Sequence, residues 1–126
     1  MLKLLYISIG GAVGAILRYG TSIAIQHFFQ NGFPLATLSV NLIGSLIAGF
    51  LYGCFESFII PQNVKLLLFV GFLGSFTTFS AFSLENFNLV RDGKYNLFVI
   101  NVMANLILGI GLVFLGYFIS KSFKNF

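Results

Sequence analysis

The residues in this sequence that are most able to do chemistry lie between Gly71 and Ser83, in the segment GFLGSFTTFSAFS. Glycine and β-branched threonine both weaken a helix, and serine and threonine hydroxyls compete for backbone hydrogen bonds. We therefore expect a break between Gly74 and Thr78, where freed backbone groups inside a membrane must line a cavity. Freed carbonyls would suit a small hard cation, whereas hydroxyl and amide N–H groups would suit an anion. The alternative is an unbroken helix whose hydroxyls bond back to its own carbonyls.

Two phenylalanines accompany these hydroxyls. Phe79 and Phe82 are three residues apart, so they share one face of a helix. The edge of a phenyl ring carries partial positive charge, and it can favour an anion without the tight grip of a fixed cation. Conduction requires sites that release the ion again. The rings therefore either face an anion path or simply contact lipid and the protein core.

Amide side chains lie in other apolar parts of the sequence. Asn41 follows Thr37 by one helical turn, so both should lie on the same face. An amide in hydrocarbon needs hydrogen-bond partners, which predicts either an interhelical hydrogen bond or an NH₂ donor facing a pore. Asn101 and Asn105, four residues apart, make a second polar face.

Two charged residues complete the candidates. Arg18 is the only cation well inside an expected span, and charges within a membrane are functional candidates by default, although a long side chain can also reach an interface. Glu85 lies one turn beyond Phe82, either in a pore vestibule or at the headgroups. The sequence contains no metal-ligand cluster, no nucleophile beside a base and no phosphate-binding loop. This pattern predicts a protein that is not an enzyme.

The composition indicates which elements position these residues. Of 126 residues, 58% are hydrophobic and 8% are charged, whereas soluble domains carry about 25% charged residues. So much apolar side chain requires lipid as its solvent, and each transmembrane helix takes about 20 residues. We therefore expect an all-α membrane protein with a single four-helix transmembrane domain over residues 1–126. The expected spans are residues 4–28, 35–56, 65–90 and 95–120, with the third helix broken mid-span.

Lysine and arginine show a weak bias between the two ends of the four expected helices, with four on one side against two, or three if Arg18 is counted, on the other. An imbalance in these residues sets the orientation of a membrane protein, so a weak imbalance permits both orientations. Two copies could then pair head to tail and supply the inverted symmetry that many transporters obtain from internal repeats. The net charge is +4, but the basic residues form no cluster. We therefore attribute the charge to residues at the membrane edges rather than to binding of nucleic acid. Lys3, Lys65, Lys121 and Lys124 fall on the side of the termini, and Arg91 and Lys94 on the other.

Small residues recur four apart in the first two expected spans. Such stripes let two helix backbones approach closely in lipid, and they predict helix contacts, although glycine is also generally common in membrane helices. The first stripe is Gly10 and Gly14, and the second is Ser45, Gly49 and Gly53.

Taken together, three motifs resemble the Fluc (CrcB) fluoride channel family. They are GGxxGAxxRY from Gly10, TxxxNxxGS from Thr37 and GFxGSFTTFSxFSxE from Gly71. The resemblance covers the first three spans in order, and the length and number of spans agree with the rest. It implies a fluoride-selective channel that lets fluoride leave the cytoplasm passively and so lowers fluoride toxicity. The location implied is the bacterial plasma (inner) membrane, with several passes and no coupling to ATP or protons.

The resemblance also implies an assembly and a set of site residues. The family forms antiparallel homodimers of dual-topology subunits in membrane lipid, with two pores in each dimer. The fluoride pore would use Asn41, Phe79, Phe82, Thr78, Ser80 and Thr37. Arg18 and Glu85 would lie at a pore entrance or serve the structure, and the backbone carbonyls of Gly74 and Thr77 would hold a structural sodium ion (Na⁺) at the dimer centre.

Two other functions remain as alternatives. A small multidrug exporter is also short and four-spanning, but such proton-coupled exporters use a carboxylate deep in the first span, where this sequence has only Arg18. A non-conducting membrane assembly subunit would explain the glycine stripes. It would not explain a hydroxyl-rich segment flanked by phenylalanines.

Overall fold

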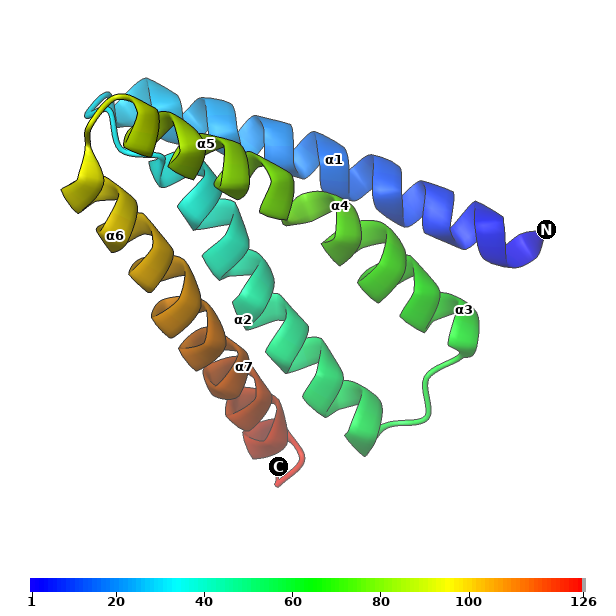
Figure 1. Ribbon diagram of the computed structural model, residues 1–126. Helices are drawn as coiled ribbons and strands as arrows, with labels where there is room; N and C mark the ends of the chain where they lie inside the picture. Colours follow the sequence, from blue (N-terminus) through cyan, green and yellow to red (C-terminus); the bar gives the residue numbers. More distant parts are fainter. Residues whose placement is uncertain (126) are drawn as a thin grey trace.

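The computed structural model describes residues 1–125, and this part of the chain consists of helices and short turns without a strand. Four helical stretches are long and apolar enough to cross a membrane. This confirms the prediction of an all-α protein with four potential spans (Figure 1). The stretches are Leu2–Phe28, Leu35–Ser57, Gln62–Arg91 and Tyr95–Phe123.

The first two spans are single helices, α1 (Leu2–Phe28) and α2 (Leu35–Ser57). The third contains α3 (Gln62–Lys65), the π-helical segment η1 (Leu66–Leu73), α4 (Gly74–Phe76) and α5 (Phe79–Arg91). The fourth contains α6 (Tyr95–Met103), the π-helical segment η2 (Ala104–Leu108) and α7 (Gly109–Phe123).

The turn between the third and fourth spans depends on one glycine. Gly93 has a φ of +75°, a conformation that glycine adopts without the steric cost of a Cβ. Its N–H donates to the carbonyl of Val90 at 3.1 Å, and the N–H of Lys94 donates to that of Leu89 at 2.8 Å. These two bonds satisfy carbonyls that the end of α5 would otherwise leave unpaired.

The helices pair out of chain order, in two arms. The most extensive contacts join α1 to η1 and α4, and join α2 to α7. Figure 1 shows the arms meeting near the 29–34 turn and diverging toward the two termini. After α4 the chain leaves the first arm, since α5 packs mainly on α6 and makes a smaller contact with α2.

Glycines set the close approach within the first arm. A Cβ on Gly10 would overlap the carbonyl of Leu67, and one on Gly14 would overlap that of Phe72. Gly71, on η1, faces the backbone of Ile7 in the same way. The first small-residue stripe is therefore a helix contact, as predicted.

The second arm uses the same principle. A Cβ on Gly49 would overlap the carbonyl of Val113, and one on Gly116 would overlap that of Leu46. Gly53 faces the hydroxyl of Ser120, which is fully buried. The second predicted stripe is thus confirmed as a contact between α2 and α7.

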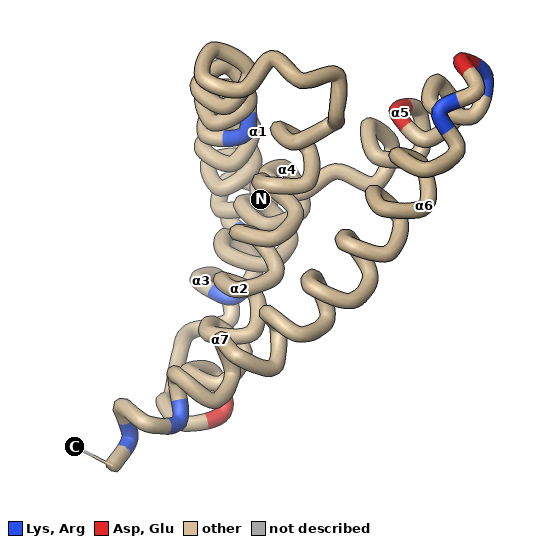
Figure 2. Tube along the Cα trace, turned by 90° about the vertical axis from the view of Figure 1, so that its left-hand side faces the viewer, with Lys and Arg blue, Asp and Glu red and all other residues tan. Residues whose placement is uncertain are grey.

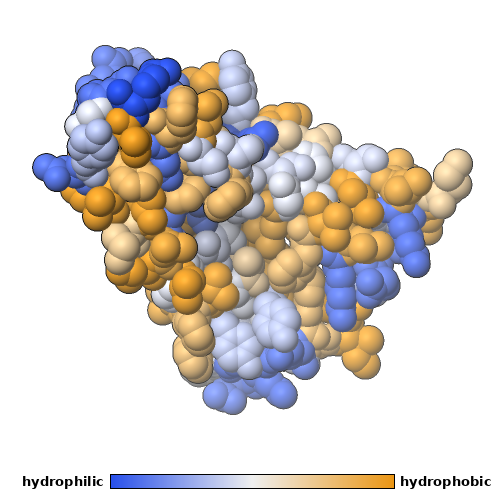
Figure 3. Space-filling view, in the orientation of Figure 1, coloured by the Kyte–Doolittle hydropathy of each residue, from blue (hydrophilic) through white to orange (hydrophobic). Residues whose placement is uncertain are grey.

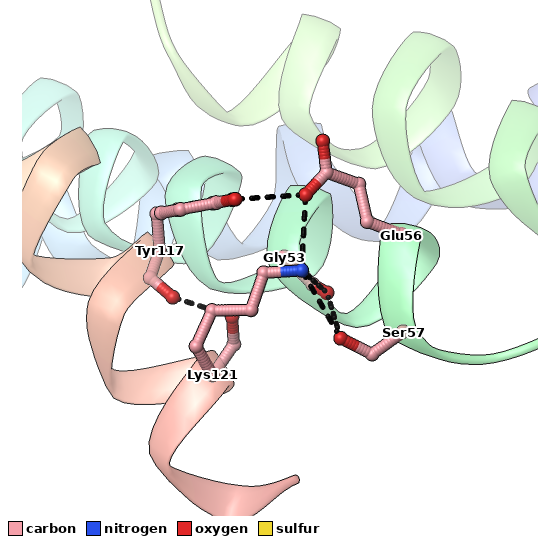
Figure 4. A network of polar contacts seen from close by, with 6 residues as sticks. Gly53, Glu56, Ser57, Tyr117 and Lys121 are labelled. Carbon is pink, nitrogen blue, oxygen red and sulfur yellow. Dashed lines mark hydrogen bonds and ion pairs between the residues drawn. The ribbon is translucent and has the colours of Figure 1, made fainter.

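A polar network joins the ends of the same two helices (Figure 4). The ammonium of Lys121 lies 2.9 Å from a carboxylate oxygen of Glu56, and the Tyr117 hydroxyl donates to the same oxygen at 2.9 Å. Lys121 also donates to the hydroxyl of Ser57 at 3.2 Å. Because both charged side chains are partly exposed, we expect this pair to contribute less than about 1 kcal/mol.

The surface agrees with a membrane location. Large apolar side chains are exposed on all four spans, and they form the broad hydrophobic areas of Figure 3. Figure 2 shows the charged positions concentrated at the turn between α5 and α6 and around the end of α7. Few side chains are buried within the single chain, and the buried hydrophobic ones are Leu38, Val40, Leu73, Phe76 and Leu89.

Candidate functional site

Two residues between α4 and α5 have extended backbone. Thr77 has φ −85° and ψ 158°, and Thr78 has φ −148° and ψ 115°. The hydroxyl of Thr78 accepts the N–H of Ala81 at 3.2 Å, which makes Thr78 the N-cap of α5. The Thr77 hydroxyl instead bonds back to the carbonyl of Leu73 at 2.9 Å. The sequence thus begins a new helix at Phe79 by using a threonine hydroxyl as its cap.

Asn41 on α2 pairs with the backbone of this interruption. Its Oδ1 accepts the N–H of Thr78 at 2.8 Å, and its Nδ2 donates to the carbonyl of Thr78 at 3.2 Å. The same Nδ2 also donates to Oδ1 of Asn105 at 3.3 Å. Both hydrogens of the amide are therefore engaged, so Asn41 makes the interhelical bonds that were one of its two predicted roles.

The interruption also frees backbone carbonyls, among them those of Gly74 and Thr77. In an unbroken helix the carbonyls of Gly74 and Thr77 would accept from the N–H groups of Thr78 and Ala81. Those two N–H groups donate instead to Asn41 and to the Thr78 hydroxyl. Backbone carbonyls are ligands for hard cations. The described residues contain no group of three or more His, Cys, Asp or Glu side chains arranged to hold a metal.

An open groove of about 540 Å³ lies beside the interruption, and we call it the Asn41 groove. The rings of Phe79 and Phe82 line it with their centroids 5.6 Å apart and their planes at 43°. Phe79 is 78% exposed. The lining residues are Asn41, Gly44, Ser45, Ala48, Phe69, Leu73, Gly74, Thr77, Thr78, Phe79, Phe82, Asn105, Leu106 and Val113.

A second groove, of about 480 Å³, is called here the Arg18 groove. Thr78 lines both grooves. Its hydroxyl lies 3.3 Å from that of Ser80, and either can be the donor. The lining residues are Ala15, Arg18, Tyr19, Ser22, Thr37, Val40, Thr78, Ser80, Ala81 and Leu84.

The structure separates Thr37 from Asn41, although they are one turn apart on α2. Thr37 lines the Arg18 groove, whereas Asn41 lines the other. The Thr37 hydroxyl donates to Oε1 of Glu85 at 2.6 Å. Oε2 of Glu85 is buried and has no hydrogen-bond partner within the described residues. Glu85 is therefore tied to α2 through Thr37 and lines neither of the two grooves.

A chain of asparagines leads away from the Asn41 groove. Asn105 donates to Oδ1 of Asn101 at 3.1 Å, and Asn101 donates to Oδ1 of Asn86 at 2.9 Å. We predicted a polar face at Asn101 and Asn105 but gave it no role, and Asn86 was missed. The signal available in the sequence was an amide in an apolar span, which must find a partner.

Comparison with known proteins gives a family. Residues 5–117 match the model for "CrcB-like protein, Camphor Resistance (CrcB)". The chain is 42% identical over 122 residues to the fluoride-specific ion channel FluC of Parabacteroides distasonis, covering 97% of this chain and 95% of the relative. It is 44% identical over 117 residues to the protein of that name from Campylobacter fetus, covering 92% and 91%. For the one from Shewanella amazonensis the identity is 45% over 116 residues, covering 92% and 94%.

Proposed function

The chain belongs to the CrcB-like family, and from this membership and its two grooves we propose how it conducts fluoride. It is a fluoride channel and a multi-pass membrane protein. The family consists of ion channels, so the prediction that the chain is not an enzyme is confirmed. The comparisons give no support to a small multidrug exporter or to a non-conducting assembly subunit.

The proposed path runs from the Asn41 groove to the Arg18 groove past Thr78. The observation that carries it is that Thr78 lines both grooves. A small, strongly hydrated anion needs hydrogen-bond donors along its path. The hydroxyls of Thr78 and Ser80 supply donors where the grooves meet. Thr37 lines the Arg18 groove beside them, with its own hydroxyl hydrogen donated to Glu85. The interruption at Thr77 and Thr78 acts as the functional break in the third span.

The phenylalanines form the weakly attractive part of this path. The rings of Phe79 and Phe82 line the Asn41 groove, and their edges carry partial positive charge. The edge of a ring attracts fluoride weakly. A fixed positive charge in the same place would form a desolvated ion pair with fluoride and hold it. Arg18, in the second groove, raises the local concentration of anions at the pore entrance. Glu85 stays outside the path and fixes α5 against α2 through Thr37.

We propose that two copies assemble as an antiparallel, dual-topology homodimer with two pores. The weak bias of lysine and arginine between the two sides supports this, because it leaves the orientation weakly determined. The Asn41 groove is open to the outside in one chain, and an ion path needs a second wall. The apolar faces of the diverging arms supply surface for that partner (Figure 3).

A structural sodium ion is proposed at the dimer centre. The carbonyls of Gly74 and Thr77 fit this role, since the N–H groups that would serve them in a helix donate elsewhere. A bound Na⁺ would neutralise these dipoles and hold two chains together. Each chain offers the pair, so the remaining ligands would come from the second copy. Replacing Na⁺ by N-methylglucamine should lower the dimer fraction in detergent, and an unchanged fraction would contradict the site.

The proposed role is passive export across the bacterial inner membrane. Hydrogen fluoride is a weak acid that crosses a bilayer uncharged and dissociates at cytoplasmic pH, which traps fluoride inside. A selective channel lets the anion leave down its gradient, aided by a negative-inside potential. This lowers fluoride toxicity without coupling to ATP or protons.

The experiment is anion efflux from liposomes that contain the purified chain. Fluoride and chloride are followed by ion-selective electrodes, with valinomycin to balance charge and no pH gradient. Rapid loss of fluoride with a silent chloride trace is expected. Absence of fluoride efflux from a folded dimer, or efflux only with a proton gradient, would contradict the proposal.

A further inference from the structure

Four asparagine side chains from three spans form one continuous chain of hydrogen bonds. Asn41 on α2 donates to Asn105 on η2 at 3.3 Å, and Asn105 donates to Asn101 on α6 at 3.1 Å. Asn101 then donates to Asn86 on α5 at 2.9 Å. Asn101 is 1% exposed and Asn86 is 7% exposed, so water does not readily replace these partners.

The direction of the chain is fixed at its Thr78 end. The backbone N–H of Thr78 can only donate, so it requires Oδ1 of Asn41 to face it, and the carbonyl of Thr78 requires Nδ2. The remaining N–H of Asn41 then requires an oxygen from Asn105. This turns the NH₂ group of Asn105 toward Asn101, and by the same argument the NH₂ group of Asn101 faces Asn86.

The other end of the chain is held by Asn86. Its Oδ1 is the acceptor that keeps the Asn101 amide in this orientation. Without an acceptor there, the buried N–H of Asn101 is left unpaired, which is costly. Turning the Asn101 amide over would bring its NH₂ group against the NH₂ group of Asn105. Two donors would then face each other, and the NH₂ group of Asn105 would keep only its bond to the backbone carbonyl of Asn101, at 2.9 Å. The Asn105 oxygen would then be held less firmly toward Asn41.

This orientation bears on the ion because Asn105 lines the Asn41 groove. Both N–H groups of Asn41 are occupied, one by the carbonyl of Thr78 at 3.2 Å and one by Oδ1 of Asn105 at 3.3 Å. A fluoride ion in this groove gains an amide donor from Asn41 by taking the place of one of these acceptors, and the Asn105 oxygen is the one carried by a mobile side chain rather than by the backbone. The chain of amides therefore decides which acceptor the ion replaces at Asn41.

We propose that Asn86 is a positioning residue for fluoride conduction, acting through Asn101 and Asn105 on the Asn41 amide. It contacts neither groove. The inference rests on the proposed function, since it assumes that the ion passes Asn41.

The test is a double-mutant cycle in the reconstituted full-length chain. Asn86→Leu, Asn105→Leu and the double variant are compared with the parent. The readouts are the initial rate of fluoride efflux and the fluoride concentration that gives half-maximal rate. Asn88→Leu is the matched control, because Asn88 lies on the same helix and takes no part in the amide chain. Elution as a folded species is checked for each variant.

Asn86→Leu should lower the rate about fivefold, the effect of one lost oriented hydrogen bond, and raise the half-maximal concentration. Asn88→Leu should change neither value. Coupled residues are non-additive, whereas independent ones add, so Asn86→Leu should have no further effect when Asn105 is already leucine. A full further loss there would overturn the proposal, because Asn86 would then act through packing.

Two further results have a defined meaning. If Asn86→Leu does not fold, Asn86→Ala enters the same cycle, with the same expected outcomes. A folded parent chain without fluoride efflux would overturn the proposed function, and the inference with it. Additivity in a conducting parent would overturn the inference alone.

Discussion

The side chain of Asn41 satisfies both backbone polar groups of Thr78, accepting its N–H at 2.8 Å and donating to its carbonyl at 3.2 Å. The side chain of Asn41 thus pairs with both backbone groups of Thr78, as the backbone of a neighbouring strand does in a β-sheet. Unsatisfied backbone groups in hydrocarbon cost several kcal/mol each. Asn41 is therefore as important for stability as for the proposed path.

Removing this side chain should destabilise the fold and abolish conduction together. Asn41→Ala leaves the N–H and the carbonyl of Thr78 without partners, at a cost of about 1–3 kcal/mol for each group. Thermal unfolding in detergent and fluoride efflux measure the two effects. Asn88→Ala, with the same change in side chain on α5, is the control. Unchanged stability of the Asn41 variant would show that other groups satisfy Thr78.

The ring of Phe79 should matter for flux and little for stability. It is 78% exposed in the single chain, so Phe79→Ala removes little buried area. Loss of about 1.4 kcal/mol of ring-edge stabilisation would slow fluoride efflux about tenfold. Phe87→Ala is the matched control, since Phe87 is 60% exposed on the same helix. Equal efflux from both variants would remove Phe79 from the path.

Close packing of α2 on α7 should make Gly49 intolerant of a methyl group. In Gly49→Ala the new Cβ overlaps the backbone carbonyl of Val113, and separating the helices costs about 1–3 kcal/mol. Gly111→Ala, on α7, is the control because a Cβ there meets nothing within 4 Å. Thermal unfolding should give a lower midpoint for the first variant and an unchanged or higher one for the second. Equal midpoints would argue against the packing.

The contribution of the hydrogen bond between Thr37 and Glu85 to stability can be measured by comparing a variant that lacks the hydroxyl with one that keeps it. Thr37→Val keeps the shape of the side chain but removes the donor that lies 2.6 Å from Oε1 of Glu85. Loss of a hydrogen bond to a carboxyl group should cost about 2 kcal/mol. Thr37→Ser retains the hydroxyl and should lie closer to the parent in thermal unfolding. A serine variant as unstable as the valine one would assign the effect to packing.

The spans and the helix contacts could be predicted because both depend on local chemistry. Hydropathy indicates four spans, and the stripes at Gly10 and Gly49 indicate which faces pack. Neither the hydropathy nor the stripes identify which helices pack together, because a small residue permits close approach by the backbone of any helix. The pairing of α1 with η1, and of α2 with α7, follows from the whole fold.

The site was only partly accessible from the sequence for a similar reason. Spacing puts Thr37 and Asn41 on one face of α2, yet they line different grooves. Thr78 lines both grooves and lies where they meet. The role of Asn86 depends on Asn101, fifteen positions later, meeting it across the turn at Gly93. The π-helical segments could not be predicted, since no residue pattern specifies one.

The two arms also constrain how the protein is made. Each arm joins helices that are not consecutive in the chain, the first span with the third and the second with the fourth. During synthesis α1 and α2 must therefore wait in the bilayer, with their glycine stripes facing lipid or each other, until their true partners emerge from the ribosome. A nascent chain that stops before α7 leaves the stripe of α2 without its partner, so the small residues of α2 remain exposed to lipid.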